Sequence, residues 1–251
     1  MLGPLAVTAA LAAAPGTAGA WHPDIAAAGA FARARRGTVS FAVRTPCGSW
    51  GDRQNAAVPS ASVLKAMLLV AELRRAGVRD RPLDAGQRRL LGPMIRWSDN
   101  ADATRVFALV GGGPLARDAR RWGMRHFAVG SPWGMSRITA RDQARFWLHL
   151  DAHVPPRHRA YALTLLHTIA GPQRWGIGQV APAGWTLYFK GGWGSGTGRV
   201  DHQVALLTRG DQRVSVAILT MAQGTHAYGK RTLRGMAARL LAGLAGRTAV
   251  C

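Results

Sequence analysis

The stretch VPSASVLKAMLLVAEL, residues 58–73, places one lysine inside an apolar helical pattern. The pattern predicts a buried helix that begins near Ser60 and ends at Gly77. Ser62 and Lys65 are three positions apart and therefore lie on the same helix face. A desolvated lysine favours its neutral amine, which is the kind of base that a serine nucleophile requires. A single S-x-x-K is also compatible with an ordinary surface lysine, so further motifs are needed to choose between the two.

The composition predicts a globular domain with a strong positive field. The chain has 251 residues, of which 48% are hydrophobic and 18% charged, and its net charge is +21 with a pI near 11.8. Such a charge favours anionic partners, among them nucleic acid, anionic lipid and acidic cell-wall polymers. The arginines are scattered and are not interleaved with aromatic residues, which argues against specific nucleic-acid binding. We therefore expect an anionic cell-wall polymer as the macromolecular partner, and the motifs indicate no cofactor and no metal.

Residues 1–20, MLGPLAVTAALAAAPGTAGA, are typical of an export signal. They contain an apolar run and a small-x-small site that ends at Ala20, so the mature chain is expected to begin near Trp21 and to be secreted or cell-wall associated. The segment is too short to span a membrane. It lacks a basic start, which leaves a buried terminal helix as the alternative. Cys47 and Cys251 are compatible with one disulfide, although their spacing does not require it.

The order of predicted elements indicates an α+β fold. Strands are expected within residues 37–58, helices from 60 to about 170, strands again within 184–222, and a last helix over 229–246. This order predicts an antiparallel sheet built from both chain ends, with flanking helices and an inserted all-helical lobe over about 60–175. We expect residues 21–251 to form one domain.

Two further motifs carry polar chemistry. Ser98, Asp99 and Asn100 stand at a predicted helix start, where they are also compatible with an ordinary cap. Lys190 ends an alternating strand and is followed by two glycines, which would let an extended substrate approach the strand edge. A tight turn with an incidental lysine is the simpler explanation of that second motif.

Taken in order, the three motifs resemble the S-x-x-K, S-D-N and K-T-G set of class A β-lactamases and penicillin-binding D,D-peptidases. The resemblance implies an exported serine hydrolase that forms an acyl-enzyme on Ser62, with Lys65 as general base. It also implies that Ser98 passes a proton to the leaving nitrogen. The residues that it assigns to substrate binding are Asn100, Lys190, Gly192 and Trp193.

The finer roles also come from the resemblance. Lys190 is expected to supply positive charge to a substrate carboxylate and to tune Ser98. The backbone N–H groups of Ser62 and Trp193 are expected to form the oxyanion hole.

Two departures from the family pattern bear on the reaction. Gly191 replaces the usual hydroxyl residue of the third motif, so Ser195 or Thr197 would have to supply that hydrogen bond. Residues 124–138, MRHFAVGSPWGMSRI, contain no acidic residue, whereas class A enzymes place there the glutamate that activates the deacylating water. The only glutamate of the chain is Glu72. We therefore expect β-lactams to acylate Ser62 and to be released slowly, and the natural substrates to be D-Ala peptides or related amides and esters.

Two alternatives remain open at this stage. One is a genuine β-lactamase that uses a base other than glutamate, such as His126. The other is a non-catalytic wall-binding or acylation-trap protein that keeps the fold without turnover.

Overall fold

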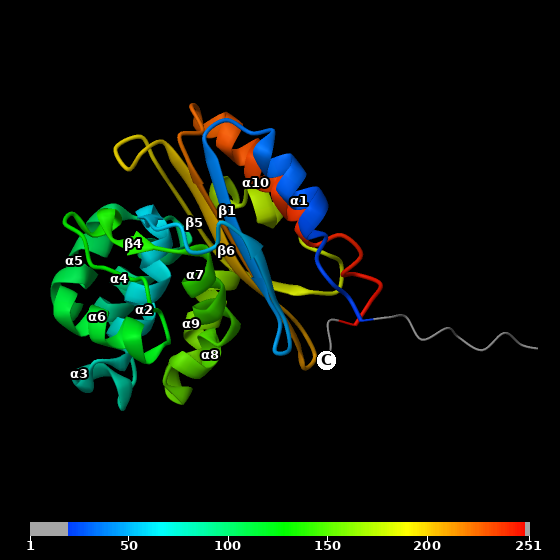
Figure 1. Ribbon diagram of the computed structural model, residues 1–251. Helices are drawn as coiled ribbons and strands as arrows, with labels where there is room; N and C mark the ends of the chain where they lie inside the picture. Colours follow the sequence, from blue (N-terminus) through cyan, green and yellow to red (C-terminus); the bar gives the residue numbers. More distant parts are fainter. Residues whose placement is uncertain (1–19, 249–251) are drawn as a thin grey trace, which may run out of the picture.

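The computed structural model describes residues 20–248 and is built on a five-stranded antiparallel sheet (Figure 1). The spatial order of the strands is β2 (Ser49–Asp52), β1 (Thr38–Arg44), β7 (Gln212–Met221), β6 (Val200–Arg209) and β5 (Thr186–Gly194). Strands from the two ends of the chain meet where β1 pairs with β7, for example at Ala42 and Ala217. The predicted sheet, built from both chain ends, is confirmed, and β5 forms one of its edges.

Helices cover both faces of this sheet (Figure 1). On one face α1 (Ile25–Arg33) and α10 (His226–Leu240) pack against each other, and on the other face α7 (Ala140–Leu148) packs on β1, β6 and β7. The sequence predicted α10 and α7 but not α1. Alanine and glycine dominate α1, so its periodicity carries little hydrophobic signal.

The remaining helices form a lobe beside the sheet, with α2 at its centre (Figure 1). They are α2 (Leu64–Arg74), α3 (Ala76–Arg79), α4 (Ala85–Arg96), α5 (Asn100–Val110), α6 (Gly112–Arg121), α8 (Leu150–His153) and α9 (Arg159–His167). Every residue of α2 from Leu64 to Leu73 is buried, because α3, α4, α5, α6 and α9 all contact it. The helix predicted to run to Gly77 is interrupted at Arg75, whose ψ of 140° is extended.

A short second sheet fixes the start of the segment that carries Ser62. Strands β3 (Val58–Pro59) and β4 (Arg137–Ile138) pair antiparallel, and the Ser60 N–H then donates to the Ser136 carbonyl at 2.7 Å. These bonds join the beginning of the 3₁₀ turn η1 (Ala61–Val63) to the end of segment 124–138. The two parts are far apart in sequence but are held side by side.

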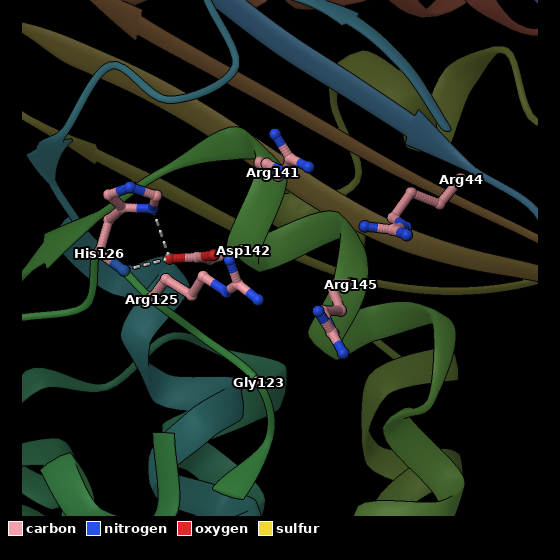
Figure 2. Close-up of a pocket in the computed structure, with 7 residues that line it drawn as sticks. All are labelled: Arg44, Gly123, Arg125, His126, Arg141, Asp142 and Arg145. Carbon is pink, nitrogen blue, oxygen red and sulfur yellow. Dashed lines mark hydrogen bonds and ion pairs between the residues drawn. The ribbon is translucent and has the colours of Figure 1, made fainter. Parts of the chain in front are cut away.

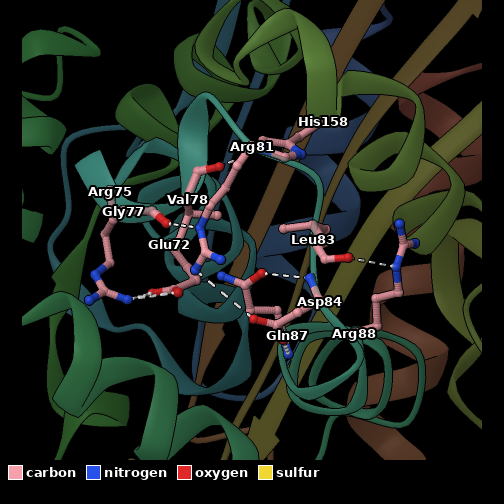
Figure 3. A network of polar contacts seen from close by, with 10 residues as sticks. All are labelled: Glu72, Arg75, Gly77, Val78, Arg81, Leu83, Asp84, Gln87, Arg88 and His158. Atoms are coloured by element: carbon pink, nitrogen blue, oxygen red, sulfur yellow. Dashed lines mark hydrogen bonds and ion pairs between the residues drawn. The ribbon is translucent and has the colours of Figure 1, made fainter.

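The only glutamate lies at the far end of α2, within a polar network (Figure 3). Glu72 is buried and accepts hydrogen bonds from Arg75 Nη1 at 2.9 and 3.1 Å. Burial raises the pKa of Glu72, and the Arg75 charge opposes that shift. Seven residues of helix separate Glu72 from Lys65, a rise of roughly 10 Å. Glu72 therefore stabilises the end of α2 and has no place beside Lys65.

The two ends of the described chain lie together. Trp21 is buried, its backbone N–H donates to the Thr248 carbonyl at 3.1 Å, and its indole donates to the Ala242 carbonyl at 2.8 Å. The expected signal segment, apart from Ala20, and Cys251 lie outside the described residues. Within residues 20–248, no helix has the length and apolar character needed to cross a membrane.

Candidate active site

Lys65 lies at the first turn of α2 with its side chain fully buried. Its Nζ donates to Asn100 Oδ1 at 2.7 Å, to Ser98 Oγ at 3.1 Å and to the Ser98 carbonyl. Burial lowers the pKa of Lys65 to about 7, and the charge of Asp99 partly opposes this shift. A substantial fraction of Lys65 is therefore neutral near pH 7 and can accept a proton.

Ser98 stands in the turn between α4 and α5, with a backbone φ of 62°. This left-handed geometry is unusual for a residue other than glycine. In this conformation both the carbonyl oxygen and the hydroxyl oxygen of Ser98 accept hydrogen bonds from Lys65 Nζ. Lys190 Nζ also donates to Ser98 Oγ, at 3.0 Å. A hydroxyl oxygen accepts two hydrogen bonds and donates one, so the two lysines leave the Ser98 proton free for another acceptor. Ser98 is thus placed to give a proton to a leaving group.

Lys190 belongs to the same network. It is buried on β5, and its Nζ donates to Ser98 Oγ and to the Gly191 carbonyl at 2.8 Å. Burial holds the pKa of Lys190 well below its ordinary value, and the nearby charge of Lys65 lowers it further. Two acceptors match the two N–H groups of a neutral amine. The geometry supports the expected tuning of Ser98, while recognition of a carboxylate by Lys190 stays a prediction.

Ser62 lies in η1, next to the edge strand of the sheet. Its side chain is partly exposed, and it follows Ala61, whose φ is 43°. Within residues 20–248 the Ser62 hydroxyl has no hydrogen-bond partner, since Lys65 donates to Ser98 and Asn100 instead. Proton transfer from Ser62 therefore requires neutral Lys65 to turn its lone pair toward the serine, directly or through water.

Gly192 allows β5 to lie against the backbone of η1. A Cβ at this position would be only 2.8 Å from both the Ser62 and the Val63 nitrogen atoms. The contact holds the Ser62 amide next to β5. The residue of β5 after Gly192 is Trp193, which is 52% exposed. This arrangement is compatible with the oxyanion hole expected from the Ser62 and Trp193 amides.

The glycine that departs from the family motif also has a structural reason. A Cβ at Gly191 would approach the Trp175 ring to 2.9 Å, so the indole fills the space of a side chain. The Thr197 hydroxyl donates to the Gly194 carbonyl at 3.2 Å, which engages one of the two expected substitutes. Ser195 remains the hydroxyl without an intramolecular partner among the described residues.

The segment 124–138 contributes an indole to the site, which the sequence analysis missed. The Trp133 ring centroid lies 5.1 Å from Lys65 Nζ, and its Nε1 donates to Thr104 Oγ1 at 3.0 Å. Trp133 is anchored on α5 and lies against Lys65. In the sequence, Trp133 stands out only as the one large residue within GSPWG. No local pattern reveals that it lies over Lys65.

His126 does not join this site. Its backbone N–H donates to Asp142 Oδ2 at 2.7 Å, and its Nδ1 lies 3.5 Å from the same oxygen. Among the described residues, none of its contacts is to Ser62, Lys65 or Ser98. The structure therefore gives no support to His126 as a replacement base.

A family model described as the β-lactamase enzyme family matches residues 80–244. The chain belongs to the β-lactamase enzyme family. The match includes Ser98, Asn100 and Lys190, and it begins after Ser62 and Lys65. The structure joins Lys65 and Lys190 through Ser98, and it packs the Ser62 backbone against Gly192 of β5. The resemblance inferred from the three motifs is confirmed, and the protein is a serine hydrolase.

Solved structures of this β-lactamase family share the fold. The β-lactamase from Sphaerobacter thermophilus is 21% identical, with a TM-score of 0.74 over 86% of this chain and 95% of that one. The class A β-lactamase of the last common ancestor of Gram-negative bacteria is 18% identical, with a TM-score of 0.73 over 86% and 97% of the two chains. A variant of that ancestor bound to 5(6)-nitrobenzotriazole gives 18% and 0.73, over 88% and 97%. No curated protein sequence matches the chain.

The first prediction concerns pH. Burial lowers the pKa of Lys65 to about 7. The rate constant for acylation of Ser62 by a penicillin should therefore rise through pH 7 and level off above it, as the Lys65 amine loses its proton. Stopped-flow labelling across pH 5–9, with the variant Lys65→Arg as the control, measures this. Arginine stays protonated and should not support labelling. A flat profile for the natural enzyme would contradict the role of Lys65.

The second prediction concerns the contact between β5 and η1. Gly192→Ala must displace the backbone around Ser62, so we expect acylation to slow at least tenfold and stability to fall by about 1–3 kcal/mol. Gly196→Ala is the matched control, because no atom lies within 4 Å of its added Cβ. Equal labelling rates for the two variants would show that the contact does not position the nucleophile.

The third prediction separates the two expected roles of Lys190. Since Lys190 is buried on Ser98, Lys190→Ala should slow acylation by an acidic β-lactam and by an uncharged ester by similar factors. The ratio of the two kcat/KM losses is the measurement. A much larger loss for the acidic substrate would assign Lys190 to carboxylate recognition instead.

Proposed function

We propose that this enzyme forms an acyl-enzyme on Ser62 with β-lactams and releases the product slowly, and that its natural substrates are D-Ala peptides of peptidoglycan or related amides and esters. The observation that carries the proposal is the position of the Trp133 side chain over Lys65. Segment 124–138 presents the indole of Trp133 to Lys65 and has no carboxylate to offer.

Acylation requires a nucleophile, a base, an acid for the leaving group and donors for the oxyanion. Ser62, Lys65 and Ser98 fit the first three roles, and the amides of Ser62 and Trp193 are candidates for the fourth. The base has a pKa of about 7, which suits proton transfer at neutral pH. The Ser62 proton passes to Lys65 as Ser62 attacks the carbonyl carbon. Ser98 then gives its proton to the departing nitrogen and receives one from protonated Lys65, whose Nζ donates to Ser98 Oγ, so both residues return to their starting protonation states.

Deacylation requires a further base that directs water at the ester. The carboxylates that follow Ser98 and the one on α2 already form hydrogen bonds or ion pairs. Asp99 Oδ1 accepts the Asp102 N–H at 2.8 Å as the cap of α5, and Asp102 pairs with Arg105 at 3.3 Å. Glu72 is buried with Arg75 at the other end of α2. These contacts support a long-lived ester, because the carboxylates near Lys65 and along α2 already serve a helix cap or an ion pair.

The edge of the sheet supports an extended peptide as substrate. Among the described residues, strand β5 pairs with β6 on one side and is an edge of the sheet on the other, and such an edge can pair with an extended peptide. A peptidoglycan substrate agrees with export of the protein, which residues 1–20 predict, and with retention in an anionic cell wall, which the net charge of +21 favours. Secretion to the cell wall is therefore part of the proposal.

The fourth prediction tests the slow release. Hydrolysis of a chromogenic cephalosporin should give a stoichiometric burst followed by very slow turnover, and intact mass should show an adduct that persists for minutes or longer. Ser62→Ala should abolish both the burst and the adduct with little change in the unfolding midpoint, because the Ser62 hydroxyl makes no hydrogen bond to any residue that the structure describes. Turnover at many per second without a burst would refute slow deacylation. An adduct that persists in Ser62→Ala would refute the nucleophile.

A further inference from the structure

Four arginines surround a cavity that lies apart from the acylation site (Figure 2). The cavity encloses about 260 Å³ and is lined by Arg44 at the end of β1, Arg125 in segment 124–138, and Arg141 and Arg145 on α7, together with Gly123, His126 and Asp142. None of the active-site residues lines it. The arginines come from three parts of the chain that only the fold brings together.

The positive charge of this arginine pocket is not compensated by the protein. Within residues 20–248, none of the four guanidinium groups forms an ion pair or donates a side-chain hydrogen bond. The single carboxylate of the pocket, Asp142, is buried and is engaged by the backbone N–H and the ring of His126. Four permanent cations therefore face one carboxylate that is already occupied.

Arg44 is the least exposed of the four arginines. Its Nε is buried and has no hydrogen-bond acceptor among the described residues, a condition that costs free energy. The pKa of Arg44 is lowered by burial and then by the charges of Arg145 and Arg141, which places these like charges close to one another. Arg145 is in turn held against Gly123, where an added Cβ would lie 2.6 Å from its Nε. The groups are thus kept near each other despite their mutual repulsion.

We propose that the arginine pocket binds a phosphate group. Guanidinium forks match phosphate oxygens in bidentate hydrogen bonds, and a multiply charged oxyanion balances several arginines better than one carboxylate does. The cavity is smaller than the range of about 300–1,000 Å³ that suits drug-sized ligands, so it fits a small anionic group. That group is either free phosphate or a phosphate unit within an anionic polymer. The site is independent of the reaction on Ser62.

The fifth prediction tests this site by calorimetric titration and by thermal unfolding of the full chain. Inorganic phosphate should bind saturably with a Kd below roughly 1 mM and raise the unfolding midpoint, while acetate at equal ionic strength should do neither. The double variant Arg141→Gln/Arg145→Gln should bind phosphate at least tenfold more weakly. Both side chains are exposed, so this variant should fold and should still be acylated on Ser62.

The matched control is Arg89→Gln/Arg157→Gln, which removes the same charge from exposed positions outside the arginine pocket. It should bind phosphate as the natural protein does. Equal weakening in the two double variants would show diffuse attraction to the basic surface and overturn the proposal, as would the lack of saturable phosphate binding by the natural protein.

Short-chain inorganic polyphosphate distinguishes the two sources of the phosphate group. Tighter binding per chain that is lost in Arg141→Gln/Arg145→Gln indicates a polymer-borne phosphate, whereas binding no tighter than that of inorganic phosphate indicates the free anion. Both outcomes support a phosphate site. Polyphosphate binding that is unchanged in Arg141→Gln/Arg145→Gln would contradict it.

Discussion

The site depends on two buried lysines that donate to one hydroxyl. Lys65 and Lys190 lie 3.1 and 3.0 Å from Ser98 Oγ, in an interior where a charge is poorly solvated. Two full charges so close together would repel strongly, so the network favours at least one neutral amine. The burial that makes the lysines costly also lowers their pKa values, as the proposed roles in proton transfer at neutral pH require.

The surrounding fold keeps the two lysine side chains away from water. The other helices of the lobe enclose α2 and bury its residues from Leu64 to Leu73. Lys65 is therefore surrounded by buried neighbours on its own helix. The opposite wall is β5, which carries Lys190 and lies against η1 at Gly192. Left-handed backbone at Ala61 and Ser98 accompanies this fit, and such strain persists only where the surrounding structure imposes it.

Segment 124–138 links two different environments. Near its start, Arg125 and His126 line the arginine pocket, and further along Trp133 covers Lys65. Its end is held by β4 and by Ser136, which pair with β3 and Ser60 ahead of Ser62. The segment that distinguishes this enzyme from the class A pattern is therefore anchored at both ends, and it brings an indole where a carboxylate is expected.

The sequence by itself determined the three motifs, the order of strands and helices, and hence the sheet from both chain ends. Those features depend on local periodicity and short spacing, which survive without knowledge of neighbours. It did not reveal α1, whose small residues give a weak pattern, nor the position of Trp133 over Lys65. Only the tertiary structure decided that Lys190 meets Ser98, that Trp175 requires glycine at position 191, and that Arg44 joins Arg141 and Arg145. These contacts join residues far apart in sequence, so packing alone determines them.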